Sequence, residues 1–130
     1  MAAWGGGPFD NDDAMDFVVE LVKAFSEERE QLIRGALALP AGEVERPEAF
    51  EAVAAAALVA AANGMKAIEP PEVAELVKAG GIPVDRQARD RARKALSRVV
   101  THGGGWREQW EKADMLPDVE AMLEGLRAHL

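Results

Sequence analysis

The sequence predicts an all-α fold: a single compact domain of five to seven short helices packed as an irregular or orthogonal bundle. Apolar residues recur at the three- and four-residue spacing of a helical face through most of the chain. Glycine and proline interrupt the pattern where helices are expected to end and begin. No alternating apolar and polar run predicts a strand, and no repeat of fixed length is present.

A chain of 130 residues suffices for one domain with its own core, so residues 1–130 are interpreted as one helical domain and residues 1–13 as an N-terminal arm. The first predicted helix follows this arm. Ser26 with two glutamates behind it is typical of a fresh helix start, so we expect a break or kink there. The apolar stripe of the first helix has the spacing i, i+3, i+4, i+7 and i+11 and comprises Ala14, Phe17, Val18, Leu21 and Phe25.

The third predicted helix is apolar on nearly every face, and we therefore place it at the centre of the domain. Pro47 fits its first turn, and Asn63-Gly64 its C-terminus. The second helix is expected to stop before Pro40, with a loop between the two.

Four shorter or more polar helices are predicted after it. The segment "EPPEVAELVKAGG" has proline at its start and glycine at its end, which predicts a short helix. Asp85 is expected to cap a fifth helix that runs to about Thr101. A short helix over residues 106–112 and a last one from Pro117 complete the chain.

The composition restricts the class of protein. There is no cysteine, which excludes a disulfide framework, a zinc finger, an iron–sulfur cluster and a thiol nucleophile. The longest apolar run, Ala52 to Ala62, is shorter than the roughly 18 residues that a membrane span needs. No secretory signal is recognised at the start of the sequence. We expect a soluble cytoplasmic protein with no membrane contact and no cofactor.

The charge is unevenly distributed. The net charge of −8 disfavours binding to nucleic acid. Between Arg86 and Arg98, however, six bases face one acid, a local sum of +5, which leaves −13 for the rest of the chain. Arg86, Arg89 and Arg93 form one stripe of this basic helix, and such a surface suits a phosphate group, an acidic partner or the protein's own acids. No aromatic residue is interleaved with the bases, as stacking on nucleobases would need.

The opening stretch "WGGGPFDNDDAMDF" supports two interpretations. In the structural one, Asp10 is the N-cap of the first helix, Asp13 takes the capping-box position, and Phe9 precedes the cap as a hydrophobic staple would. In the functional one, oxygen atoms of the segment bind a ligand or a divalent cation, with tryptophan as one wall of the pocket. The candidate ligand-binding residues are Trp4, Phe9, Asp10, Asn11, Asp12 and Asp13. An EF-hand is excluded because no glycine and no glutamate stand at its sixth and twelfth positions.

The same stretch resembles the N-terminal signature of the bacterial domain-of-unknown-function family 4259, which begins Trp-Gly-x-Gly-x-Phe-Asp-Asn-Asp. The matching residues are Trp4, Gly5, Gly7, Phe9, Asp10, Asn11 and Asp12. The similarity continues weakly through the alanine-rich "AVAAAALVAAANG" and the C-terminal "LEGLRAHL". The resemblance implies a small, soluble, bacterial α-helical domain, and it brings no activity, cofactor or catalytic residue.

Further along the chain, "HGGGW" at residues 102–106 places glycines before a helix start. This arrangement receives an anion on free N–H groups, or it ends one helix and connects it tightly to the next; His102 joins the candidate anion-binding residues on the first interpretation. Trp106 and Trp110 are one turn apart, and with Trp4 they are expected to form an aromatic cluster of the core.

Groups for catalysis are few. His102 and His129 are the only histidines, and neither has the partner spacing of a helical metal site. Ser26 and Ser97 lack a nucleophile-elbow context. The favoured hypothesis is therefore a non-catalytic binding or regulatory protein, immunity- or antitoxin-like, that contacts a protein partner. The alternative is a small enzyme or a ligand- or metal-binding protein with its pocket at the "WGGGPFDNDD" motif.

Overall fold

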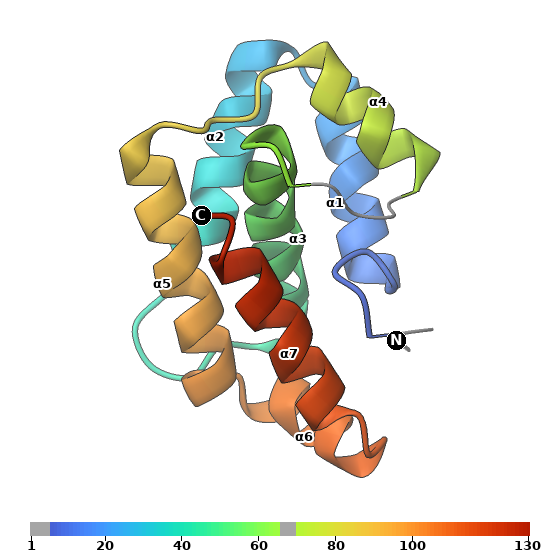
Figure 1. Ribbon diagram of the computed structural model, residues 1–130, viewed down its shortest axis with the longest axis vertical. Helices are drawn as coiled ribbons and strands as arrows, with labels where there is room; N and C mark the ends of the chain where they lie inside the picture. Colours follow the sequence, from blue (N-terminus) through green and yellow to red (C-terminus); the bar gives the residue numbers. More distant parts are fainter. Residues whose placement is uncertain (1–5, 66–69) are drawn as a thin grey trace.

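The computed structural model describes residues 6–65 and 70–130, which form seven α-helices and no strand. The helices are α1 (Asp12–Lys23), α2 (Ser26–Leu37), α3 (Arg46–Ala62), α4 (Pro71–Ala79), α5 (Arg86–His102), α6 (Gly104–Lys112) and α7 (Leu116–Arg127). Figure 1 shows α3 in the middle of the bundle, with α1 on one side of it and α5 on the other. The all-α prediction is confirmed.

Helix α3 is central because its sequence is almost entirely small and apolar. Eleven of its 17 residues are buried, and seven of these eleven are alanines. Every other helix contacts it. Alanine side chains let neighbouring helices approach closely, and a high helix propensity keeps the segment helical. The prediction of a central third helix is confirmed, including its end at Asn63 and Gly64, where Gly64 has a φ of 101°.

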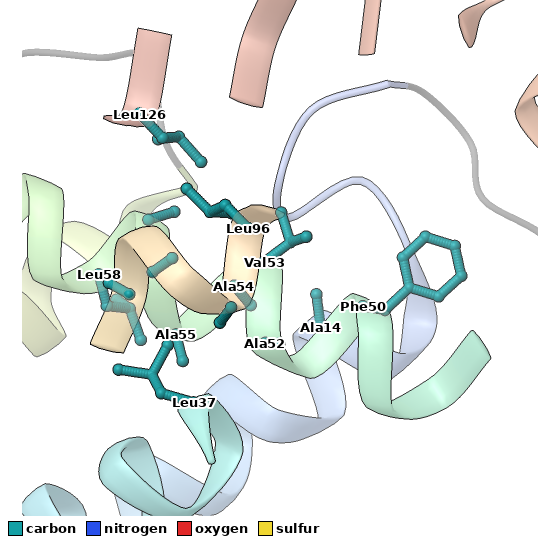
Figure 2. Close-up of a cluster of buried hydrophobic side chains, with 14 of the residues drawn as sticks. Ala14, Leu37, Phe50, Ala52, Val53, Ala54, Ala55, Leu58, Leu96 and Leu126 are labelled. Atoms are coloured by element: carbon teal, nitrogen blue, oxygen red, sulfur yellow. The ribbon is translucent and has the colours of Figure 1, made fainter. Parts of the chain in front are cut away.

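The core contains side chains from across the whole described chain (Figure 2). Ala14 of α1, Leu37 of α2, Leu96 of α5 and Leu126 of α7 all surround the buried face of α3 in that view. Helix α6 lies at the lower end of the bundle in Figure 1. Its two tryptophans, Trp106 and Trp110, are buried. The rings of Phe50 and Trp110 pack edge to face at 6.4 Å, as do those of Trp106 and Trp110. The expected aromatic cluster therefore forms within the core, while Trp4 lies outside the described residues.

Helices α1 and α2 are separated by a sharp corner, as the sequence predicted, but two details of that prediction were wrong. Ala24 ends α1 in an extended conformation (φ −85°, ψ 150°), and Phe25 is the N-cap of α2, so Ser26 is the first helical residue instead of the cap. The apolar stripe of α1 buries Ala14, Phe17, Val18 and Leu21, but Phe25 is 81% exposed. The extended Ala24 shifts Phe25 out of the helical phase that would have placed it in the core.

The start of α5 at Asp85 is confirmed, but the side chain of Asp85 makes a different contact from the expected one. Asp85 occupies the N-cap position, but its side chain does not cap the helix. Instead, Asp85 Oδ1 accepts a hydrogen bond of 2.9 Å from Arg34 of α2. This bond lowers the pKa of Asp85 and raises that of Arg34, and it ties the beginning of α5 to α2. Asp85 therefore serves a contact between helices.

No helix of the described residues is both long enough and apolar enough to cross a membrane; the two longest have 17 residues each.

Candidate functional site

The described part of the opening stretch forms a tight turn around Gly7 and Asp10. The backbone N–H of Gly7 donates to Asp10 Oδ2 at 3.0 Å, and the N–H of Asp10 donates to the carbonyl of Gly7 at 3.2 Å. A Cβ on Gly7 would lie 2.7 Å from Asp10 Oδ2, so a larger residue at position 7 would displace this carboxylate from the N–H of Gly7. The carboxylate of Asp10 is thereby directed back toward the arm.

The N-cap of α1 is Asn11, and the prediction that Asp10 would cap this helix was wrong. Asn11 is 2% exposed, and its Oδ1 accepts a hydrogen bond of 2.7 Å from the N–H of Ala14. Asp10 is not available for this role because its carboxylate accepts from Gly7. Asp12 and Asp13 occupy the first turn of α1, where a negative charge interacts favourably with the helix dipole.

The turn is fixed to the body of the domain by apolar contacts. Phe9 is buried in the core, and a Cβ on Gly6 would lie 3.1 Å from Met115 and 3.4 Å from Val119 of α7. The segment from Gly6 to Asn11 is thus held by packing at its start and by capping at its end. Of the six predicted ligand-binding residues, Phe9 and Asn11 are buried and Trp4 lies outside the described residues.

Asp13 of the motif lines a hollow in the surface. The hollow is open, has a volume of about 550 Å³, and is lined by Asp13, Glu43, Val44, Glu45, Arg46, Pro47 and Gly105. In the part of the chain that the structure describes, no group of three or more His, Asp or Glu side chains is arranged to hold a metal ion.

The glycines of "HGGGW" make a tight connection between α5 and α6. A Cβ on Gly103 would collide with the carbonyl oxygen of Val99, so the connection requires glycine there. A Cβ on Gly104 would collide with the carboxylate of Glu43. The start of α6 is therefore faced by a carboxylate of the protein itself, which occupies the space where an external anion would approach.

Many of the bases of α5 interact with other groups of the protein. Asp90 lies between Arg86, at 4.0 Å, and Arg93, which donates to it. Arg98 donates to the carbonyls of Pro40 and Gly42 and so holds the loop before α3. Of the predicted anion-binding residues, Arg86 and Arg93 thus share one acid, and Arg89 is half-buried. His102 is exposed and its Nδ1 lies 2.7 Å from the hydroxyl of Thr101.

The opposite side of α3 carries acids that have no such partners. In the described residues, no base lies within ion-pair distance of six carboxylates of α1 and the first turn of α2. We call these the acidic face: Asp12, Asp13, Asp16, Glu20, Glu27 and Glu28. Only one exposed base, Lys23, lies among them.

The acidic face changes the titration of a neighbour. Partial burial raises the pKa of Glu51 on α3, and repulsion from Glu20, Asp13 and Glu48 raises it further. A carboxylate whose pKa is raised by like charges reports a locally concentrated negative potential. The sequence had predicted an acidic molecule, and the structure gathers six acids without ion-pair partners on α1 and the first turn of α2.

The corner between α1 and α2 is held by a buried arginine that no sequence motif indicated. Arg29 is 7% exposed, and its guanidinium donates to three backbone carbonyls. These are Leu21 at 3.0 Å, Ala24 at 3.1 Å and Gly80 at 2.6 Å. Two of these carbonyls belong to the C-terminal end of α1, where a cation is favoured by the helix dipole.

Fold and site together define a small, acidic, all-α domain with a capped N-terminal turn, an unpaired acidic face and a fixed helix corner. The family model "Domain of unknown function (DUF4259)" matches residues 2–121, and the chain belongs to this family. No curated protein and no solved structure matches the chain. The resemblance noted from the sequence is therefore confirmed at the level of the family.

Proposed function

We propose that this protein is a non-catalytic binding or regulatory protein that acts by contact with a basic protein partner, in the manner of an immunity protein or an antitoxin. The proposed setting is the bacterial cytoplasm. The observation that carries the proposal is the acidic face. Six carboxylates without ion-pair partners in the described chain repel one another, and bringing them together is unfavourable unless a positive surface neutralises them.

The pairing pattern elsewhere supports this choice of surface. Three acids of α6 and α7 form ion pairs within their own helices: Glu108 with Lys112, Glu111 with Arg107, and Glu124 with Arg127. The bases of α5 are partly used by Asp90 and by loop carbonyls. The acidic face carries six carboxylates without an ion-pair partner in the described chain and one exposed base, Lys23, and a negative field of this kind accelerates association with an oppositely charged protein.

The test is capture from native cell extract by the immobilised protein at low and high salt. The test variant neutralises two exposed acids that are not needed for capping, Asp16→Asn with Glu20→Gln. The control neutralises two paired acids on the other side, Glu108→Gln with Glu124→Gln. We expect the wild type and the control to retain a basic protein, and the test variant to retain at least tenfold less of it. High salt should release the retained protein. Equal retention by both variants, or no retained protein, would contradict the proposal.

A second candidate is small-ligand binding in the hollow that Asp13 lines, because this hollow lies beside the opening motif. Its test is a thermal-shift titration of the wild type and Asp13→Asn with Mg²⁺, Mn²⁺ and inorganic phosphate. A concentration-dependent rise in Tm that the variant lacks would favour it over the partner-binding function.

A further inference from the structure

We infer that the partner binds at the α1–α2 corner and that Phe25 is its anchor, inserted into an apolar pocket of a basic protein surface. The inference rests on the proposed function and names the place and chemistry of the contact. We call Val19, Val22 and Phe25 the corner surface.

The first argument is exposure. Phe25 is 81% exposed, Val22 53% and Val19 47%, and these are three of the four large exposed apolar side chains in the described residues. Val19 and Val22 are one helical turn apart on α1, and Phe25 follows at the end of that helix. An exposed aromatic ring that follows a helix with two exposed valines is costly in water, and aromatic residues of this kind contribute most of the binding energy at the apolar centre of protein interfaces.

The second argument is rigidity. The carbonyl of Phe25 accepts a hydrogen bond of 2.8 Å from the N–H of Arg29, and the side chain of Arg29 fixes Leu21 and Ala24 on the preceding helix. The same guanidinium donates to the carbonyl of Gly80, so the loop after α4 is also joined to the corner. The backbone that presents Phe25 is therefore fixed before any partner arrives, which reduces the entropy lost on binding.

The third argument is charge, which selects the occupant. Phe25 is followed by Glu27 and Glu28 and preceded on α1 by Glu20, all belonging to the acidic face. An apolar centre with an acidic rim fits an apolar pocket with a basic rim. A second copy of this chain carries a net charge of −8 and would bring like charge to this surface, and anionic membranes and nucleic acids are repelled for the same reason.

The experiment uses the full chain immobilised against native cell extract, followed by titration of the retained protein after its purification. The test variant is Phe25→Ala, and the control is Arg91→Ala, an exposed residue on α5 across the central helix. Since the ring of Phe25 is largely in solvent, both variants are expected to keep the wild-type Tm. We expect Phe25→Ala to raise the Kd at least tenfold and Arg91→Ala to leave it within twofold, with a retained protein of basic pI.

The outcomes separate the inference from the proposed function. One outcome is that the retained protein binds Phe25→Ala as tightly as the wild type but binds the Asp16→Asn, Glu20→Gln variant more weakly. In that case Phe25 is not the anchor, and the proposed function stands. If no protein is retained, both fail. If sedimentation velocity shows a homodimer that Phe25→Ala dissociates, or if the retained species is acidic or a nucleic acid, the basic partner is wrong.

Discussion

Gly81 lies directly against the backbone of Ser26, the first residue of α2. A Cβ built on Gly81 would stand 3.0 Å from the carbonyl oxygen and 3.1 Å from the Cα of Ser26. The φ of Gly81 is 83°, in the left-handed region. The loop between α4 and α5 therefore packs on the α1–α2 corner through a contact that glycine alone allows.

Gly81→Ala is expected to destabilise the domain by more than the roughly 1–2 kcal/mol that a left-handed conformation costs an ordinary residue, because the methyl group also displaces the backbone of Ser26. Gly42→Ala is the matched control, since Gly42 has a φ of 88° and an added Cβ there meets nothing within 4 Å. Chemical denaturation of both variants gives the two free energies of unfolding. Equal losses would show that the contact with Ser26 is not needed.

Arg29→Lys is expected to cost about 3 kcal/mol, because charged hydrogen bonds contribute about 1.5–3 kcal/mol each and an ammonium group cannot reproduce the planar fork that serves three carbonyls. Arg34→Lys provides a comparison, since Arg34 makes its contacts with Glu30 and Asp85 at the surface. The measurement is the free energy of unfolding together with amide hydrogen exchange at the corner. A loss no greater for Arg29→Lys than for Arg34→Lys would contradict the role of Arg29 as the support of the corner.

Asn11→Ala removes the N-cap of α1 and is expected to cost about 1 kcal/mol, within the range of about 0.5–2 kcal/mol for such caps. Asn11→Asp should recover most of the loss, because its carboxylate can accept from the N–H of Ala14. Thermal unfolding of the two variants measures the difference. A similar loss for both would mean that Asn11 stabilises the turn by some route other than capping.

Glu51→Gln is expected to raise Tm at pH 7. The pKa of Glu51 is raised above its ordinary value of 4.5, so the folded state binds its proton more tightly than the unfolded state does. The unfavourable ionised form weakens folding above the raised pKa, and this penalty disappears as the pH falls through that pKa and then below 4.5. The advantage of the variant should therefore shrink when Tm is measured at successively lower pH. An advantage that persists unchanged at low pH would exclude an electrostatic cause.

Most of the fold was predictable because helical periodicity and the glycine and proline positions are local signals. The third helix is the clearest case, since a segment apolar on all faces has only the centre of the bundle to occupy. The sequence did not predict the exposure of Phe25. A single extended residue, Ala24, ends the helical periodicity of α1, so Phe25 no longer lies on the buried face of that helix. In the sequence, only Ser26, Glu27 and Glu28 indicate this break, and they do not show which residue is extended.

The candidate site was less predictable than the fold for two physical reasons. Asp10 and Asn11 are both good caps, and only the bond between Asp10 and the N–H of Gly7 decides between them. Arg29 stands in "SEERE", a sequence typical of an exposed helix start, whereas its partner Gly80 is distant along the chain. The first outcome depends on a choice between two equally suitable local caps, and the second depends on a contact between distant segments.

The alanine interior of α3 limits how this protein can change over evolutionary time. At Ala54, Ala55 and Ala56, which are completely buried, every replacement except glycine adds volume to a packed space, and glycine costs about 1 kcal/mol in helix propensity. Saturation mutagenesis of α3 should therefore give a band of positions that accept almost nothing but alanine. Sequence drift is then expected to concentrate on the outer helices, which carry the exposed surface of the domain.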